Sequence, residues 1–350
     1  MDIGAAIEKF QRREDLDRDE ARSVMAQLLS GGVADSEIVA LLVALRDKGE
    51  QVSELVGFAE VMRRRASEGL REAGVDVEGL SRGGPLLDTC GTGGDEKGTF
   101  NVSTAAALVA AAAGVRVAKH GNRSISSRCG SADVLEALGV RIDIPLGRIP
   151  ECLEKVGMVF LFAPRLHLAM KHVMNARRAL KTKTVFNLLG PLTNPLCASV
   201  QLAGVYDRAR TEMMAQALAA VGTERAFVVA GHDGVDEITL TGPTQVSETN
   251  SGSLTTRDVV PGDFGLASAP GEALRGGDAP TNARLLCEVL AGAAGPLRDL
   301  VLANASAALV VAGKAADFLA GTELAREMLD SGAARATLEK LVQLTQPAAP

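Results

Sequence analysis

A glycine-rich segment from Asp88 to Thr104 contains the residue types that bind phosphate. It follows a short apolar run, carries four glycines, and leads into an alanine-rich stretch that is predicted to be a helix. Glycines let backbone N–H groups approach phosphate oxygens closely, and a helix start offers unpaired donors and the positive end of a dipole. The sequence therefore predicts an anion-binding loop between a strand and a helix.

Two standard phosphate motifs do not fit this segment. A dinucleotide-binding G-x-G-x-x-G that starts at Gly91 would need glycine at position 96, where Glu96 stands. A Walker A loop spaced from Gly93 to Gly98 would need lysine where Thr99 stands. The polar residues that accompany the glycines are Asp95, Lys97, Asn101, Ser103 and Thr104. They favour a phosphate loop of another type over a purely structural turn.

A second group of cations and donors follows the next predicted strand. Lys119 stands at the end of an apolar run, and ligands collect at the carboxyl ends of the strands in open parallel sheets. The donor-rich loop behind it contains Gly121, Asn122, Arg123, Ser124, Ser126, Ser127 and Arg128. This loop predicts a site for a second anionic group, although a solvated surface position also fits Arg123 or Arg128 taken singly.

A third segment concentrates positive charge at Arg177, Arg178, Lys181 and Lys183. The planar guanidinium group of arginine binds a carboxylate through two parallel hydrogen bonds, so an arginine here suits a substrate carboxylate. Solvated positions on a helix face fit Arg178 and both lysines equally well.

Asp236 and Glu237 are adjacent acids that directly follow a predicted strand and turn. Paired carboxylates beside a phosphate site suit Mg²⁺, which prefers oxygen ligands and arrives with substrate phosphates. Adjacent acids in a turn are more often merely solvated, so the prediction of a metal site depends on the phosphate loop.

The cysteines and histidines predict no covalent catalysis. The five cysteines are widely spaced with no C-x-x-C pair, which indicates a reduced protein without disulfides or a zinc site. We expect Cys90, which lies inside the glycine-rich loop, to be a small packing residue. No serine or cysteine is combined with a histidine and an acid in the manner of a nucleophile and its base.

The composition argues against two classes of partner. The net charge is -6, aromatic residues make up 3% of the chain and tryptophan is absent, so we expect no nucleic-acid binding. The N-terminus is charged too early for a signal peptide, and no apolar run reaches ~18 residues. We therefore expect no membrane association and a cytoplasmic location.

The chain divides into a helical part and an alternating part. Residues 1 to about 73 are predicted to be helical, with helices over 17–31, 38–49 and 53–65 and a linker over 71–84. Short apolar runs then alternate with helical patterns, which is typical of a mainly parallel, buried sheet. The runs expected as strands are 86–88, 115–118, 142–144, 158–162, 201–206 and 226–230. The predicted fold class is α/β: a small all-helical N-terminal domain plus a large α/β domain whose mainly parallel central sheet is flanked by helices.

Taken together and in this order, the segments resemble the anthranilate phosphoribosyltransferases of tryptophan biosynthesis. The resemblance rests on GTGGD with FNVST, KHGNR with GSADVLEALG, RR with FNLLGPLTNP, and the DE pair, and it covers nearly the whole chain. It implies that the amine of anthranilate attacks C1 of phosphoribosyl pyrophosphate as pyrophosphate leaves. It also implies a small domain of residues 1–73 joined by part of 165–185, a large domain of residues 74–350, and a homodimer formed through the helical domains.

The resemblance also assigns residues to both substrates and to two Mg²⁺ ions. The residues implied for phosphoribosyl pyrophosphate are Gly91, Thr92, Gly93, Gly94, Asp95, Thr99, Asn101, Val102, Ser103, Thr104, Lys119 and Ser131. Those implied for anthranilate are Gly91, His120, Asn122, Arg177 and Pro191. Those implied for the metal are Ser103, Asp236 and Glu237. No catalytic acid or base is implied, so acceleration would come from positioning and charge stabilisation, chiefly by Lys119 and the metal-bound groups.

The chain departs from the family pattern in the segment that frames the acceptor pocket. His167-Leu168 stands where the family commonly has His-Pro, and the run from Leu180 to Thr184 stands where it commonly has Leu-Gly-x-Arg-Thr. Two alternatives stay open from the sequence. One is a pyrimidine nucleoside phosphorylase-like enzyme of the same fold, and the other is a non-catalytic relative that binds nucleotides.

Overall fold

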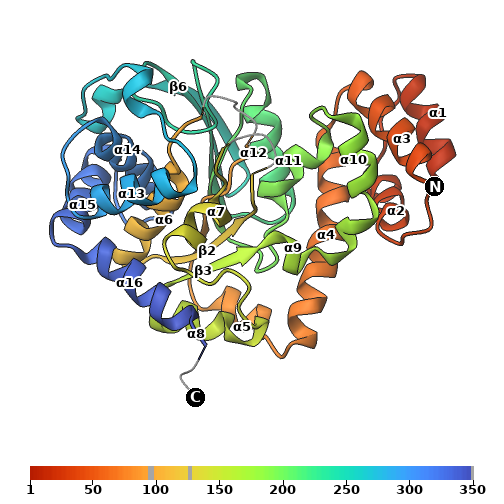
Figure 1. Cartoon of the computed structure of the whole chain (residues 1–350). Helices are drawn as coiled ribbons and strands as arrows, with labels where there is room; N and C mark the ends of the chain where they lie inside the picture. Colours follow the sequence, from red (N-terminus) through yellow and green to blue (C-terminus); the bar gives the residue numbers. More distant parts are fainter. Residues whose placement is uncertain (94–97, 125–127, 348–350) are drawn as a thin grey trace.

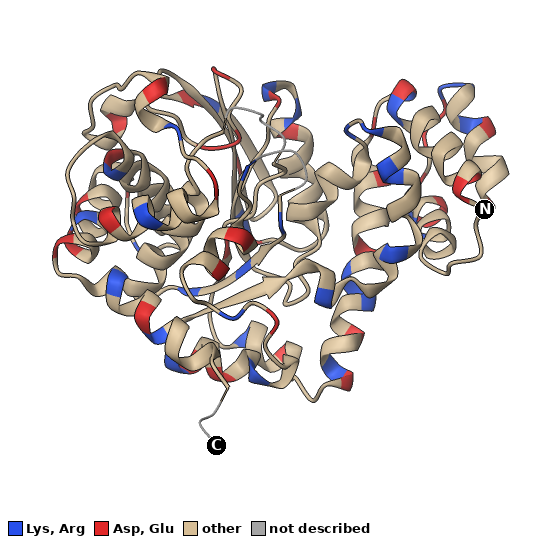
Figure 2. Cartoon of the chain, in the orientation of Figure 1, with Lys and Arg blue, Asp and Glu red and all other residues tan. Residues whose placement is uncertain are grey.

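The computed structural model describes residues 1–93, 98–124 and 128–347. It consists of a helical part at the N-terminal end and a larger α/β part, which lie side by side (Figure 1). The helical part contains α1 (Ile3–Gln11), α2 (Arg18–Leu28), α3 (Asp35–Lys48) and α4 (Val52–Glu72). Both signs of charge are interspersed over the two parts (Figure 2).

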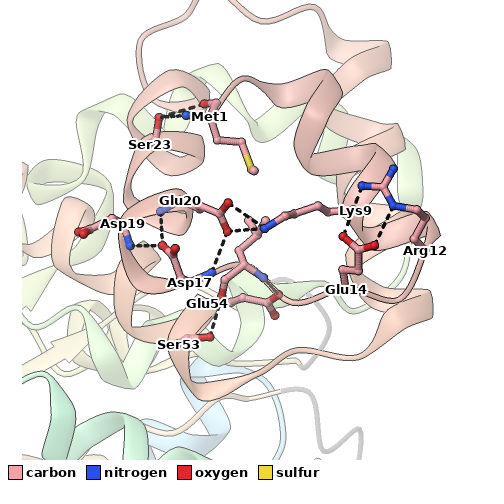
Figure 3. A network of polar contacts seen from close by, with 11 residues as sticks. Met1, Lys9, Arg12, Glu14, Asp17, Asp19, Glu20, Ser23, Ser53 and Glu54 are labelled. Carbon is pink, nitrogen blue, oxygen red and sulfur yellow. Dashed lines mark hydrogen bonds and ion pairs between the residues drawn. The ribbon is translucent and has the colours of Figure 1, made fainter.

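Helix α2 of the N-terminal part begins at a well-formed cap. Asp17 accepts hydrogen bonds from the backbone N–H groups of Asp19 (2.9 Å) and Glu20 (2.8 Å), while the Glu20 side chain accepts from the Asp17 N–H. This reciprocal capping box at the start of α2 is seen in Figure 3. Close by, the fully buried Glu54 accepts from the Leu16 N–H (3.0 Å).

Two of these helices approach each other so closely that a glycine is required. A Cβ atom on Gly57 of α4 would lie 2.5 Å from the Arg18 carbonyl oxygen and 2.6 Å from the Ala21 Cβ of α2. Backbone atoms cannot yield at that distance, so any side chain at position 57 would separate the two helices.

An ionic cluster holds the same pair of helices together. Arg18 and Arg22 of α2 both donate to the carboxylate of Glu60 on α4. Burial alone would raise the pKa of Glu60, but the hydrogen bonds from the two arginines outweigh it and lower the pKa to about 2. This carboxylate therefore contributes stability that is present above its ordinary pKa of 4.5 and lost as the pH falls toward 2.

Glu60→Gln is expected to lower the free energy of unfolding by about 1 kcal/mol at pH 7, since solvent screening limits the worth of such pairs. Urea unfolding at pH 7 and pH 3 would measure it, and the deficit should shrink at the lower pH. Glu14→Gln, which breaks the exposed pair with Arg12, serves as the matched control and should change stability little. A deficit that is the same at both pH values would contradict the ionic account.

The α/β part contains a seven-stranded sheet with the order β3-β2-β1-β4-β5-β6-β7. Neighbours from β3 to β5 pair in parallel, whereas β5–β6 and β6–β7 pair antiparallel. The strands are β1 (Leu86–Asp88), β2 (Arg116–Gly121), β3 (Met158–Phe162), β4 (Val200–Gly204), β5 (Arg225–Gly231), β6 (Thr244–Asn250) and β7 (Ser253–Val259). The prediction of a mainly parallel sheet is confirmed.

Helices cover both faces of this sheet, as Figure 1 shows. One face packs against α6 (Val102–Ala112), α13 (Ala279–Leu290), α14 (Pro296–Val311), α15 (Phe318–Asp330) and α16 (Ala333–Thr345). The other face packs against α8 (Ile149–Lys155), α11 (Val185–Leu192) and α12 (Thr211–Ala220). The short helix α7 (Ser131–Ala137) follows β2. Helix α6 is buried along almost its whole length because its alanines let α14 and the sheet approach closely.

A returning segment connects the α/β part to the helical part. It contains α9 (Ala163–Leu166), the short helix η2 (Leu168–His172) and α10 (Met174–Leu180), which packs against α3. Arg63 in the middle of α4 ties the two parts together, since it donates to the carbonyl oxygen of Leu192 (2.5 Å) and to that of Val221 (2.9 Å). These carbonyls end α11 and α12, so Arg63 satisfies acceptors that a helix terminus leaves open.

Several local predictions were wrong. Residues 142–144 form no strand, the expected linker contains helix α5 (Val77–Arg82), and the third helix continues past residue 65 to Glu72. Residues 63–65 form a basic run in this helix, and Arg63 within it is only 6% exposed, so the run is not a solvated helix face. In the described part of the chain, no helix is long and apolar enough to span a membrane.

Candidate active site

The glycine-rich loop leaves the end of β1 and is held by the turn that carries the paired acids. The Thr92 N–H donates to the Gly204 carbonyl oxygen (2.8 Å), and the Gly93 N–H donates to Oδ2 of Asp236 (2.7 Å). A Cβ atom on Gly91 would lie 2.7 Å from that same Oδ2, and one on Gly204 would lie 1.6 Å from the Asp236 carbonyl oxygen. The two segments thus meet only because both glycines lack a side chain.

Helix α6 begins at the far end of this loop. Val102 and Thr104 in its first turn are buried, and the Thr104 hydroxyl is buried without a hydrogen-bond partner among the described residues. Asn101 precedes the helix but does not cap it with its side chain. Its amide instead donates to the Cys129 carbonyl oxygen (3.3 Å) and accepts from Asn282 (2.8 Å). Asn101 therefore ties the helix start to the loop after β2 and to α13.

Lys119 on β2 points toward the start of α6. Its Nζ donates to the Thr89 carbonyl oxygen (2.6 Å), the Thr89 hydroxyl (3.1 Å) and the Ser103 hydroxyl (3.2 Å), and the side chain is almost fully buried. Burial lowers the pKa of Lys119, and the nearby carboxylate of Asp88 opposes this shift. The structure thus brings Lys119 and Ser103 together at the start of α6.

Asp88, the last residue of β1, is a fully buried carboxylate next to the site. It accepts hydrogen bonds from the His120 N–H (3.0 Å) and from the Asn194 side chain (2.8 Å), which also donates to the Ala118 carbonyl oxygen (2.8 Å). Burial raises the pKa of Asp88 to about 6, and the hydrogen bond from Asn194 limits that rise. This carboxylate joins the ends of β1 and β2 to the segment after α11.

The described residues on both sides of the loop after β2 are tied to α7, because the Ser124 and Gly130 N–H groups donate to the Asp133 carboxylate. The Asn122 carbonyl oxygen accepts from the Ala132 N–H (3.2 Å), and Ser131 is the first residue of α7. Arg123 forms ion pairs with Asp133 and Glu136, so its charge is already used by acids of the chain. Asn122 directly follows Gly121 at the end of β2, and the Ser131 hydroxyl donates to the Asn122 carbonyl oxygen (3.4 Å).

Two histidines meet on the other side of β2. Nδ1 of His120 lies 3.2 Å from the Gly190 carbonyl oxygen, and its Nε2 lies 3.2 Å from Nε2 of His167. Burial lowers the pKa of His120 to about 4 and that of His167 to about 3, so both rings are neutral at neutral pH. Pro191, next to Gly190, accepts at its carbonyl from Gln201 (2.6 Å).

Arg177 is a cation that the protein surrounds with apolar groups. Its guanidinium carbon lies 5.1 Å from the centre of the Phe186 ring, and its Nη1 lies 3.9 Å from Sδ of Met174. Burial lowers the pKa of Arg177. Among the described residues no carboxylate forms an ion pair with it, whereas most buried charges are paired. Arg178, the next residue, is exposed.

The two family departures lie on either side of α10. Lys181 has a φ of 48°, a left-handed conformation that glycine adopts without strain. Lys183 places its Nζ 3.6 Å from the centre of the Tyr206 ring, a cation–π contact with the segment that follows β4. Leu168 is 67% exposed.

The paired acids provide only oxygen ligands. Asp236 lies against the glycine-rich loop, and Glu237 lines a cavity of ≈ 240 Å³ together with Thr99, Thr239 and His232. Hard carboxylate oxygens next to a phosphate loop fit Mg²⁺, which takes one or two carboxylates together with substrate phosphates. Gly94 and Asp95, which were expected in the donor site, lie outside the described residues.

Comparisons with known proteins agree with this geometry. Residues 5–66 match the helical bundle domain of a glycosyl transferase family, and residues 83–335 match the α/β domain of the same family. An anthranilate phosphoribosyltransferase of Solibacter usitatus is 52% identical over 341 residues, 97% of this chain and 98% of that protein. The chain belongs to the anthranilate phosphoribosyltransferase family. It is thus a glycosyltransferase, and the family resemblance inferred from the sequence is confirmed.

Structures of other anthranilate phosphoribosyltransferases confirm the fold. That of the enzyme from Thermus thermophilus superimposes with a TM-score of 0.87 at 43% identity, covering 98% of this chain and 99% of that one. The enzyme of Saccharomyces cerevisiae in complex with phosphoribosyl pyrophosphate and Mg superimposes with a TM-score of 0.85 at 26% identity, covering 98% and 97%. A helical domain followed by a mostly parallel α/β domain is therefore the family architecture.

The sequence missed three residues that shape the site. The contact of His167 with His120 was not predicted, and neither was the buried polar contact that Asp88 and Asn194 form under the loop. An acid at the end of a short apolar strand was the one available signal for Asp88. The partners of Asn194 and His167 depend on tertiary contacts across 106 and 47 positions.

Proposed function

We propose that this chain transfers the phosphoribosyl group of 5-phosphoribosyl 1-pyrophosphate to the amine of anthranilate, giving N-(5-phosphoribosyl)anthranilate and pyrophosphate, the second step from chorismate to tryptophan. The observation that carries the acceptor assignment is Arg177, a half-buried guanidinium that stacks on Phe186 and has no ion pair with a described carboxylate. An aromatic carboxylate would supply the negative charge that this position lacks, and its flat apolar ring suits the apolar surroundings of Arg177. Family membership and the structure of the yeast relative in complex with 4-fluoroanthranilate support the assignment.

The donor half of the site is the loop after β1 with the start of α6. Gly91, Thr92, Gly93, Gly94 and Asp95 would hold the pyrophosphate, and Lys119 would reach its oxygens through the position it shares with Ser103. The donor residues Thr99, Asn101, Val102, Thr104 and Ser131 would complete the cradle. The Thr104 hydroxyl is buried without a hydrogen-bond partner among the described residues. An oxygen of the bound donor would supply that partner.

Two Mg²⁺ ions are part of the proposal. Asp236 and Glu237 would hold one, and Ser103 would be near the other. When bound, the ions neutralise the charge of the leaving pyrophosphate. Support comes from the oxygen-only ligand set at the turn and from the Mg-containing structure of the yeast relative.

The protein's own groups would act by position and charge. Arg177 orients the ring through the carboxylate, and His120, Pro191, Asn122 and Gly91 line the acceptor pocket. The aromatic amine is already a neutral nucleophile, so no base is needed to activate it. As the bond to pyrophosphate breaks, the ammonium of Lys119 and the loop N–H groups stabilise the charge that develops on the leaving group. The neutral histidine pair adds no competing cation beside the amine.

The proposal also covers the oligomeric state, the domain boundaries and the location of the protein. A homodimer formed through the helical domain is part of the proposal. A groove of ≈ 430 Å³ on that domain supports it, with a lining that combines Phe10, Ala40, Val43 and Ala44 with Gln11, Arg13, Asp47 and Lys48. Light scattering of the purified protein tests it. We place residues 1–73 with part of 165–185 in the small domain and residues 74–350 in the large one. A cytoplasmic location, with no nucleic-acid or membrane partner, completes the proposal.

A substrate panel separates the proposal from its nearest alternative. With Mg²⁺, phosphoribosyl pyrophosphate and anthranilate, the fluorescence of anthranilate should fall. With uridine or thymidine and inorganic phosphate, no free base should appear. Release of base from a nucleoside, with no loss of anthranilate, would favour the pyrimidine nucleoside phosphorylase reading. Donor binding without either reaction would favour a non-catalytic relative.

A further inference from the structure

Three side chains of types that bind metal ions lie close together at the ends of β1 and β2. The ligand atoms of Asp88, Cys90 and His120 all lie within 4.8 Å of one another, and all three residues are buried. Successive residues of a strand point to opposite faces. Lys119 therefore points toward the start of α6, while the next residue, His120, points toward Gly190 of α11. The group contains neither Asp236 nor Glu237, the acids that offer only oxygen ligands.

A second imidazole stands beside this group. Nε2 of His167 lies 3.2 Å from Nε2 of His120, with the rings edge to face at 5.1 Å between centres. Two lone pairs cannot face each other at that distance, so either a hydrogen or a cation must lie between the nitrogens. Two nitrogens bound to one tetrahedral Zn²⁺ at 2.0–2.1 Å are about 3.3 Å apart.

The surroundings of His120 match those of a metal-binding histidine. Its Nδ1 lies 3.2 Å from the Gly190 carbonyl oxygen, and such a backbone carbonyl commonly orients a ligating ring. His167 likewise has a backbone hydrogen bond to Thr193. Asp88 accepts two hydrogen bonds, and a carboxylate has further lone pairs with which to bind an ion.

The protonation states suit a cation as well. Both imidazoles are neutral at neutral pH because burial lowers their pKa, and the neutral ring is the form that binds metal. Burial raises the pKa of the Cys90 thiol, so that without an ion it stays protonated and unreactive. A bound divalent cation displaces that proton to solvent, and the thiolate together with Asp88 then balances its two charges.

We propose that Asp88, Cys90 and His120, with His167 beside them, form a binding site for a thiophilic divalent cation of the Zn²⁺ type. A thiolate with imidazole ligands selects such an ion over Mg²⁺. This site shares His120 with the proposed acceptor pocket, but its test reads out metal binding rather than phosphoribosyl transfer, so the failure of one proposal is distinguishable from the failure of the other.

Titration of the metal-free, full-length protein with Co²⁺, a spectroscopic substitute for Zn²⁺, tests the proposal. We expect one equivalent to bind with a thiolate-to-metal charge-transfer band, and Zn²⁺ to displace it. Cys90→Ser should abolish the band and weaken Zn²⁺ binding at least about 100-fold. The matched control is the double variant of the exposed cysteines, Cys197→Ser with Cys287→Ser, which should keep both.

Two results would overturn the site. One is a wild-type protein that shows no thiolate band at one equivalent of Co²⁺. The other is a band that survives in Cys90→Ser but disappears from the double control variant. Cys90→Ala provides a second variant should the serine hydroxyl disturb folding, and the far-ultraviolet circular dichroism of each variant verifies that it is folded.

Discussion

Lys119→Gln is expected to lower kcat/KM for phosphoribosyl pyrophosphate by about 10²- to 10³-fold, the range for loss of one charge-stabilising donor. The ammonium group is buried and donates hydrogen bonds to Thr89 and Ser103. This position lies at the start of α6, where the glycine-rich loop after β1 ends. Glutamine is shorter and uncharged, so it reaches neither the pyrophosphate nor the charge that develops on it. Steady-state kinetics at saturating anthranilate measure the change.

A lysine outside the site provides the control for this substitution. Lys155→Gln removes a lysine that is 61% exposed and paired with Glu151, and the kinetic constants should stay unchanged. The thermal unfolding midpoint of each variant separates a lost interaction from a lost fold. If Lys119→Gln retained wild-type kcat/KM for the donor, Lys119 would have no part in pyrophosphate binding or departure.

Arg177→Ala is expected to raise KM for anthranilate by about 10- to 100-fold, with KM for the donor almost unchanged. A hydrogen bond to a charged group is worth about 1.5–3 kcal/mol, which corresponds to this range. The effect should be confined to the acceptor because Arg177 lies on α10, beside Phe186, and contacts none of the loop after β1 that is described.

The neighbouring arginine is the matched control for the acceptor site. Arg178→Ala removes the same side chain from the same helix at an exposed position, so both KM values should stay near those of the wild type. Equal increases in the two KM values of Arg177→Ala would point to a general disturbance of the domain junction. They would contradict a specific role in carboxylate binding.

The glycine-rich loop was predictable because its backbone approaches other groups too closely for any side chain. The close approach of Asp236 to Gly91 and Gly204 requires glycines, and the alanines of α6 follow from the tight packing of that helix. A position that tolerates only glycine is visible in the sequence itself, so these close approaches left a signal there. The ordered helices of the first 73 residues were predictable for a similar reason, since their caps and apolar spacing are local features.

Features that depend on tertiary packing were not predictable. Ile142 and Ile144 looked like a strand, but they fill two different clusters of the core from a turn. The outer strand β7 was missed because most of its side chains are exposed, so it lacks an apolar run. Arg63 lies in a basic run that resembles a solvated face, and only the fold shows the helix ends that it binds.

The most direct test of the two-substrate site measures both products of one turnover series. Anthranilate fluorescence and released pyrophosphate are followed together in a mixture of protein, Mg²⁺, phosphoribosyl pyrophosphate and anthranilate. We expect one pyrophosphate for each anthranilate consumed, and no pyrophosphate when anthranilate is omitted. Pyrophosphate release that proceeds while anthranilate fluorescence stays constant, or the absence of both signals from the folded protein, would contradict the account.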